Sequence, residues 1–148
     1  MRRILHPSDF STASNAALRK AIELARTSRG QLLIAHVISP VVPVAGGGYI
    51  SPKVYDEIAT SNRAWAQRQM AKLLAQAKKA GVRTSGTLLE GVAQEQIIRF
   101  ARSKRVDVIV MGTHGPSGLA KLFLGSVAGR VVGAATCPVL TVRGRGRK

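Results

Sequence analysis

The sequence lacks the features of a disulfide-linked or membrane-spanning protein. It has one cysteine, Cys137, which excludes a disulfide within the chain. No apolar run approaches the roughly 20 residues that a membrane-spanning helix needs, so no membrane association is expected. After Met1, Arg2 and Arg3, only the two apolar residues Ile4 and Leu5 precede His6 and Pro7, and this run is too short for the apolar region of a signal peptide. Together these absences favour the cytoplasm.

Acidic and aromatic residues are also scarce. Seven Asp and Glu stand against 23 Lys and Arg, which gives a formal charge of +16 and suggests a polyanionic partner. The basic residues are spread along the chain, however, and the one dense cluster is the carboxyl-terminal stretch 143–148. Its glycines and lack of apolar residues predict a disordered tail. Aromatic residues make up 4% of the chain, too few for an evident base-stacking platform.

Segments of strand and helix pattern alternate along residues 1–142, and we expect these to form one domain. Apolar runs predict strands at residues 3–6, 31–38, 83–89, 106–111 and 138–142. Helical periodicity lies between them: after the N-cap candidates Ser11 and Thr12 up to Gly30, and at residues 53–80, 92–105 and 126–135. Such alternation predicts an α/β fold with a parallel sheet covered by helices on both faces.

The connection Ser39–Pro52 differs from the others in its composition. It contains three prolines and the run Gly46–Gly48, which predicts a loop or lid. In the long helix after it, five apolar residues are expected on related faces, with Trp65 packed onto the sheet: Val54, Ile58, Trp65, Leu73 and Ala77.

The segment after the strongest strand carries the chemistry. Folds of this kind bind ligands beyond the carboxyl ends of their strands, where the winding direction reverses. Gly112 and Gly115 follow that strand, and Gly125 and Ser126 open the last helix. Glycines let the backbone approach a ligand, and a helix start offers unpaired N–H groups to phosphate oxygens. The alternative is a glycine-rich turn in which Ser126 is only the N-cap.

The spacing resembles that of a known family. Gly112-x2-Gly115-x9-Gly125-Ser126 is similar to the ATP-binding signature of the universal stress proteins, Gly-x2-Gly-x9-Gly followed by Ser or Thr. The resemblance covers nearly the whole chain, including the opening and closing strands. It implies a single five-stranded parallel sheet of order 3-2-1-4-5 with a Rossmann-like nucleotide site, and a homodimer formed through the last strand.

The resemblance also implies a role for each residue of the site. Asp9 would meet the ribose hydroxyls or a nucleotide-bound Mg or Mn ion, with no metal held by the protein alone. His114 is not part of that pattern, but its place in the loop predicts that it borders the phosphates. The adenine and ribose cleft would be lined by Pro7, Ser8, Val37 and Met111. The phosphates would be cradled by Gly112, Gly115, Gly125, Ser126 and the N–H of Val127.

One position departs from the family pattern. ATP-binding members often carry a second hydroxyl residue where this chain has Ala128. A missing hydrogen bond to a charged phosphate would cost about 1.5–3 kcal/mol. ATP affinity would then be lower, or ADP, AMP or cyclic AMP would be preferred.

Other readings of the residues stay open at this point. Asp9 could instead cap the next helix. The three histidines, His6, His36 and His114, could together hold a metal ion, although His6 and His36 are expected to form local hydrogen bonds instead. No nucleophile with a base is evident, so a binding and signalling role is expected, with slow ATP hydrolysis at most. The alternative functions are a nucleotide-independent interaction protein and a basic nucleic-acid-associated protein.

Overall fold

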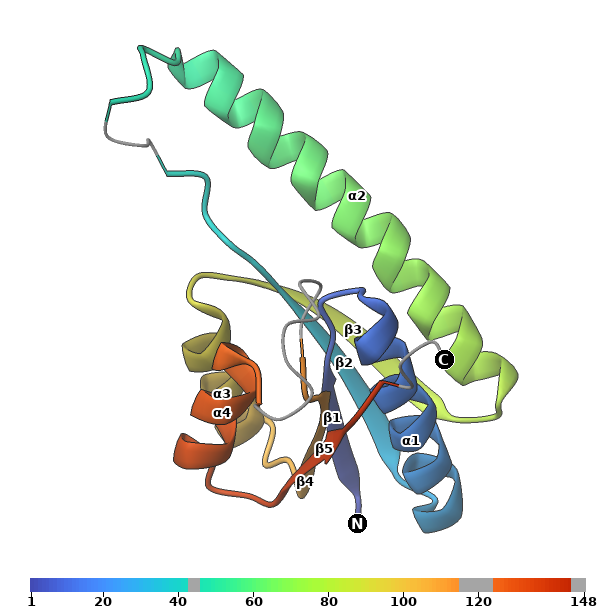
Figure 1. Ribbon diagram of the computed structural model, residues 1–148. Helices are drawn as coiled ribbons and strands as arrows, with labels where there is room; N and C mark the ends of the chain where they lie inside the picture. Colours follow the sequence, from blue (N-terminus) through green and yellow to red (C-terminus); the bar gives the residue numbers. More distant parts are fainter. Residues whose placement is uncertain (43–45, 115–123, 145–148) are drawn as a thin grey trace.

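The computed structural model describes residues 1–42, 46–114 and 124–144, in which strands and helices alternate strictly (Figure 1). The predicted tail lies mostly outside these residues. The strands are β1 (Arg3–Pro7), β2 (Gln31–Ile38), β3 (Arg83–Glu90), β4 (Val108–Gly112) and β5 (Val139–Val142). The helices are α1 (Thr12–Ser28), α2 (Pro52–Lys79), α3 (Ala93–Ser103) and α4 (Ser126–Ala134).

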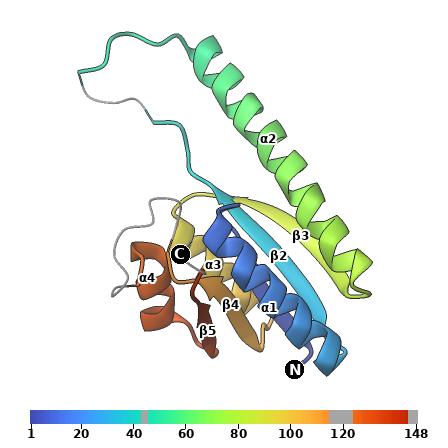
Figure 2. The same cartoon turned by 45° about the vertical axis from the view of Figure 1, so that its right-hand side comes forward.

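All five strands are parallel, and their order is β3-β2-β1-β4-β5, as the family resemblance implied. Helices α1 and α2 cover one face of the sheet, and α3 and α4 cover the other (Figure 2). Ile4 and Leu5 are neighbours on β1 and both fully buried, yet they belong to different core clusters. Successive side chains of a strand point to opposite faces, so the chain has two cores separated by the sheet. No described helix is long and apolar enough to span a membrane.

Helix α1 begins as predicted but ends differently. Ser11 is its N-cap, and the Ser11 hydroxyl accepts a hydrogen bond from the N–H of Ser14 at 3.2 Å. Gly30 was expected to close the helix, but Arg29 takes the left-handed conformation with a φ of 51°. Gly30 serves another purpose, because a Cβ there would lie 3.0 Å from the carbonyl oxygen of Met1. The glycine therefore lets the amino-terminal segment pass close by.

The expected core face of α2 is wrong in its amino-terminal half. The buried residues of the helix are Ala66, Met70, Leu73 and Ala77. Val54, Ile58 and Trp65 are exposed, because this half of the helix projects past the edge of the sheet (Figures 1 and 2). Trp65 does not pack onto the sheet as predicted; it meets the ring of Phe10 edge-on, with centroids 5.4 Å apart.

The turn before β4 shortens the strand that the sequence predicted. The strand begins at Val108, and Asp107 lies in the turn before it. The Asp107 carboxylate accepts hydrogen bonds from the N–H groups of Arg2 and Arg3 at 2.5 and 2.9 Å. These bonds hold the pKa of Asp107 below its ordinary value. They also tie the amino end of β1 to the start of β4.

Candidate functional site

A cavity of about 400 Å³ opens at the carboxyl ends of the central strands. Strands β1 and β4 pair only at Ile4–Val108 and Leu5–Ile109, and they separate beyond these residues. Helix α1 follows β1 to one face of the sheet, whereas α4 lies on the other face (Figure 2). The cavity therefore lies at the topological switch point, where ligands of doubly wound sheets bind.

The structure brings together nearly all residues that the sequence marked. Ten of the eleven predicted site residues line the cavity: Pro7, Ser8, Asp9, Val37, Met111, Gly112, His114, Gly125, Ser126 and Val127. The eleventh, Gly115, lies outside the described residues. Five further lining residues were not predicted: Ser14, Ala35, Ala93, Ile97 and Thr113. The cavity is also lined by Ala128, His36 and Ser39, which the sequence indicated as the departure from the phosphate-binding pattern, a candidate metal ligand and the start of the loop Ser39–Pro52. Ala93 and Ile97 lie one turn apart on α3. Their sequence pattern is that of ordinary core residues, so no motif could have identified them as residues that line the cavity.

One wall of the cavity is apolar. Ala35 and Met111 come from the sheet, Ile97 from α3 and Ala128 from α4, and all four are buried. Val37 at the end of β2 packs against the same cluster. A wall of this kind suits a flat apolar ring, with polar groups at the rim to orient it.

The opposite end of the cavity is formed by the start of α4. Gly125 is the N-cap, and its N–H donates to the carbonyl oxygen of Thr113 at 2.6 Å. The alternative in which Ser126 is the N-cap is therefore wrong, since Ser126 is the first helical residue. The N–H groups of Ser126, Val127 and Ala128 have no acceptor among the described residues, while that of Gly129 returns to Gly125. Unpaired donors and the positive end of the helix dipole together favour an anion here.

Asp9 stands in a tightly held loop between β1 and α1. Its Oδ1 accepts the N–H of Ser11 at 2.9 Å, so Asp9 shapes the loop and Ser11, not Asp9, caps the helix. Phe10 takes a φ of 64°, an uncommon conformation for a bulky residue. The Phe10 ring stacks on His36 with centroids 4.3 Å apart, and His36 Nδ1 donates to the carbonyl oxygen of Ser8 at 2.7 Å. These contacts hold Asp9 at the rim of the cavity.

A buried histidine lies behind this loop. His6 is fully buried, and its Nδ1 donates to the carbonyl oxygen of Val110 at 2.8 Å. Its Nε2 lies 3.4 Å from the Ser14 hydroxyl, which lies 3.0 Å from the Ser8 hydroxyl. Burial lowers the pKa of His6 to about 4, so the ring is neutral near pH 7. Within the described residues, no group of three or more His, Cys, Asp or Glu side chains is arranged to hold a metal ion.

The lack of a side chain on Gly112 allows the first turn of α1 to pack close to the end of β4, beside the cavity. A Cβ on Gly112 would lie 3.3 Å from the carbonyl oxygen of Ala13 and 3.5 Å from the N atom of Ser14. A side chain at this position would therefore push on the first turn of α1. Gly112 serves helix packing as well as the cavity that it lines.

The fold and the cavity define the class of the protein: a doubly wound, Rossmann-like α/β protein with a ligand cleft at the switch point of its sheet. The family model described as the universal stress protein family matches residues 1–143, and the chain belongs to that family.

Individual relatives agree with this assignment. Universal stress protein MJ0531 of Methanocaldococcus jannaschii is 35% identical over 144 residues, which cover 96% of this chain and 82% of that protein. The solved structure of protein MJ0577 from the same organism superposes with a TM-score of 0.83 at 24% identity, covering 99% of this chain and 98% of that one. A universal stress protein solved in complex with cAMP superposes with a TM-score of 0.73 at 22% identity, covering 97% of each chain.

Proposed function

We propose that this universal stress protein binds ATP or another adenine nucleotide in the switch-point cavity and acts in stress response or signalling through nucleotide-dependent partner binding. The observation that carries the proposal is the pairing of two chemistries in one cavity. The apolar wall between the sheet, α3 and α4 suits the base. The N–H groups at the start of α4, which have no acceptor within the described part of the chain, suit the phosphates. The relative solved with cAMP holds an adenine nucleotide on the same fold.

The proposed positions of the nucleotide groups follow from the elements that line the cavity. Pro7, Ser8, Val37 and Met111 would contact the base and ribose, and Asp9 at the rim would contact the ribose hydroxyls or a nucleotide-bound Mg or Mn ion. The phosphates would lie against Gly112 and the first turn of α4, beside His114. The described lining residues include no Lys or Arg, and the donors that they offer to phosphate are the backbone N–H groups at the start of α4.

Ala128 bears on which nucleotide fits. It is 3% exposed and lies in the first turn of α4, so a hydroxyl is missing beside the proposed phosphate site. ADP, AMP or cAMP would lose less from this absence than ATP, which has the most phosphate oxygens to satisfy. Bound nucleotide would then order the loop Ser39–Pro52, which begins at the cavity with Ser39, and so change partner binding.

The test is thermal unfolding with ATP, cAMP, GTP and tripolyphosphate at matched ionic strength, on wild type, Ser126→Asp and Ser61→Asp. An aspartate at the first position of α4 suits the helix dipole but repels phosphate. Ser61→Asp adds the same charge to an exposed site on α2. A ligand at about 100 times its Kd adds about 2.7 kcal/mol to the free energy of unfolding.

We expect the adenine nucleotides to stabilise wild type and Ser61→Asp more than GTP or tripolyphosphate does, and Ser126→Asp to lose this effect. Equal stabilisation by all four ligands, unchanged in Ser126→Asp, would instead support binding of polyanions by the basic surface. Stabilisation by none would support a nucleotide-independent interaction protein.

A further inference from the structure

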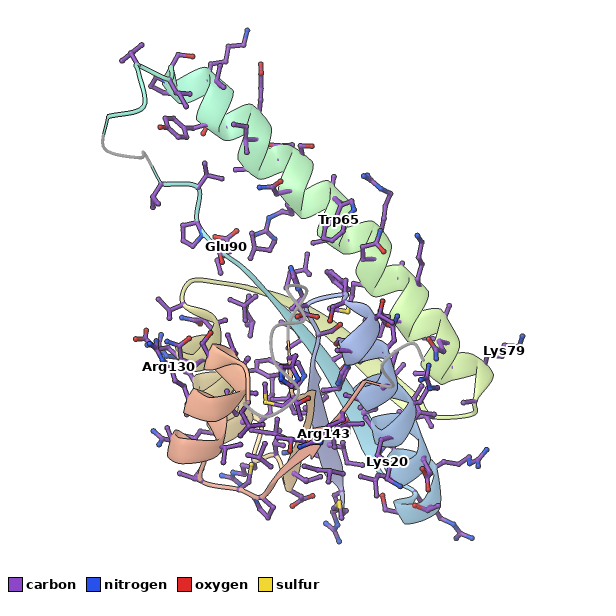
Figure 3. All side chains as sticks on the ribbon, viewed as in Figure 1. Lys20, Trp65, Lys79, Glu90, Arg130 and Arg143 are labelled. Carbon is purple, nitrogen blue, oxygen red and sulfur yellow. The ribbon has the colours of Figure 1, made fainter. Side chains whose placement is uncertain are left out.

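The basic residues of the chain are concentrated at the end of the molecule opposite the switch-point cavity. In a parallel α/β fold each helix ends, and the next strand begins, at the same edge of the sheet. We call this the amino edge, and it is formed by residues 1–3, 26–31, 78–83, 102–108 and 134–139. It carries ten of the 23 Lys and Arg residues but only one of the seven Asp and Glu residues, Asp107. Figure 3 shows Lys79 at the amino edge, whereas Glu90 lies at the other end of the sheet. The amino edge therefore attracts anions.

Helix dipoles explain only part of this charge. The negative end of a helix dipole stabilises cations in the last turn, which accounts for residues such as Arg26 and Lys79. Arg3 and Arg83 lie on strands β1 and β3 instead, and a sheet has only a small net dipole. Arg3 is two residues before Leu5, which belongs to the core beneath α3, so Arg3 projects to the same face of the sheet.

A second cavity, of about 410 Å³, opens on that face at the amino edge. We call it the amino-edge cavity. Gln31 of β2 and Ser85 and Thr87 of β3 line it from the sheet. Its charged lining residues are Arg3 and Lys104, and no Asp or Glu is among the described residues that line it. It shares no lining residue with the switch-point cavity, so it is a separate site.

The polar side chains of β3 in this cavity depart from the pattern of a parallel strand, which is usually apolar on both faces. The other face of β3 is tightly covered by α2, since a Cβ on Gly86 would lie 2.7 Å from the sulfur atom of Met70. On the cavity side Ser85 is exposed and Thr87 is half-buried, because the helices of that face pack over the central strands. The side chains of Gln31, Ser85 and Thr87 form no hydrogen bond within the described part of the chain. They remain available to a ligand.

The two cations are held beside these polar groups. Arg3 Nη1 donates to the carbonyl oxygen of Lys104 at 2.7 Å, which leaves the other N–H groups of the guanidinium available. Lys104 Nζ lies 5.7 Å from the centroid of the Phe100 ring. Neither side chain forms an ion pair with a described carboxylate, because the Asp107 carboxylate accepts from the backbone N–H groups of Arg2 and Arg3. A solvated polar strand would account for the hydroxyls, but not for two cations fixed next to them.

We propose that the amino-edge cavity binds a small phosphorylated molecule with hydroxyl groups, of the sugar phosphate class. Arg3 and Lys104 bind the phosphate, for which the planar guanidinium offers two parallel donors. Ser85 and Thr87 bind the hydroxyl groups, because their own hydroxyls both donate and accept. The volume lies within the range of small-molecule sites. Phe100, the one aromatic residue among the described lining residues, lies under Lys104, so no ring is offered to stack a nucleic-acid base.

Amide shifts in nitrogen-15 NMR spectra of the full-length protein test the location of this site. The probes are glucose 6-phosphate, glucose and inorganic phosphate at matched ionic strength. We expect glucose 6-phosphate to give saturable shifts at Ser85, Thr87 and Lys104 but not at Ser126, with a Kd about tenfold below those of the other two probes. Shifts confined to the start of α4 would assign the phosphate to the switch-point cavity and overturn the proposal. The absence of shifts at millimolar glucose 6-phosphate would overturn it as well.

Matched variants separate the cavity from the general charge of the amino edge. Lys104→Gln and Lys79→Gln remove the same charge at the amino edge, the first inside the cavity and the second outside it. We expect Lys104→Gln to weaken the binding of glucose 6-phosphate about tenfold and Lys79→Gln to change it by less than about twofold. Thr87→Val keeps the shape of the side chain without its hydroxyl, and should weaken glucose 6-phosphate more than inorganic phosphate.

Two results with these proteins would contradict a cavity for sugar phosphates. Equal losses in Lys104→Gln and Lys79→Gln would mean that the whole amino edge attracts anions without a defined site. An oligothymidylate that shifts amides along all segments of the amino edge, where glucose 6-phosphate shifts none, would instead indicate a surface for a nucleic-acid backbone. Circular dichroism of each variant checks that the fold is retained.

Discussion

His6 Nδ1 lies 2.8 Å from the carbonyl oxygen of Val110 and joins β1 to β4 just beyond the last backbone pair of these strands, Leu5–Ile109. A carbonyl oxygen only accepts, so Nδ1 carries the proton and Nε2 is left as an acceptor. The Ser14 hydroxyl then donates to Nε2 and can accept from the Ser8 hydroxyl. One buried imidazole thus connects β1, β4 and the first turn of α1 behind the Asp9 loop.

This arrangement predicts a loss of stability in mild acid. The pKa of folded His6 is about 4, below its ordinary value of 6.5, so the unfolded chain takes up a proton first as the pH falls. The free energy of unfolding should therefore decrease between pH 6.5 and pH 4, by about 3 kcal/mol from this group, and the contribution is fully present above pH 6.5.

Urea unfolding across that pH range measures the effect, with His6→Asn as the comparison. An asparagine amide can still donate to Val110 but does not titrate. We expect the variant to be less stable at pH 7 and to show a flatter profile from pH 6.5 to 4. Parallel profiles for the two proteins would mean that other groups cause the acid sensitivity.

Gly112→Ala should destabilise the protein and weaken nucleotide binding together. The new methyl group would lie 3.3 Å from the carbonyl oxygen of Ala13, and the backbone of α1 cannot yield as a flexible side chain would. We expect a loss of about 1–3 kcal/mol in the free energy of unfolding. The control is Gly133→Ala in α4, where nothing lies within 4 Å of the added methyl group. That substitution should stabilise by about 0.5–1 kcal/mol, and a loss of similar size in both variants would contradict the packing explanation.

Asp9→Asn separates the charge of this side chain from its role in the loop. The amide oxygen can still accept the N–H of Ser11, which the Asp9 carboxylate accepts at 2.9 Å. If the carboxylate meets the ribose hydroxyls or a nucleotide-bound Mg ion, ATP affinity should fall about tenfold, equivalent to about 1.4 kcal/mol. Calorimetric titration with and without Mg measures this. Asp56→Asn on α2 is the control, and equal affinities for all three proteins would remove Asp9 from the site.

The edge of β5 away from β4, along which no described strand pairs, is the expected site of a homodimer. The carbonyl oxygens of Pro138 and Val142 accept from Ile109 on β4 and from Thr113 directly after β4, so by the alternation of the strand the N–H of Thr141 points outward. Thr141→Pro should remove that outward donor and weaken strand-to-strand pairing without breaking the ladder to β4. Thr141→Val keeps the donor and should associate like wild type. Light scattering compares the masses, and unchanged association of Thr141→Pro would place the dimer contact elsewhere.

Most of the fold could be predicted from local pattern. The continuous apolar character of residues 31–38 predicts a strand covered on both faces, and β2 forms there because a buried parallel strand needs apolar residues on both sides. Helix and strand signals predicted every described element, although the signal for β3 was weaker than the others, and the ends of several elements differ from those predicted. Arg29 rather than Gly30 takes the left-handed conformation that ends α1. Position 30 has a different requirement, since the carbonyl oxygen of Met1 lies too close for a side chain there.

The sequence by itself determined the strand and helix order, the glycine spacing and the start of α4 at Ser126, because these depend on residues near one another in the chain. The tertiary structure decided the rest. Ala93 and Ile97 line the cavity only because α3 packs beside α4, and His6 connects β1 to β4 only because the strands separate at the switch point. Trp65 carries the same apolar signal as Leu73, yet it is exposed because the sheet ends before the helix does. Burial depends on where the rest of the molecule lies, which no local pattern records.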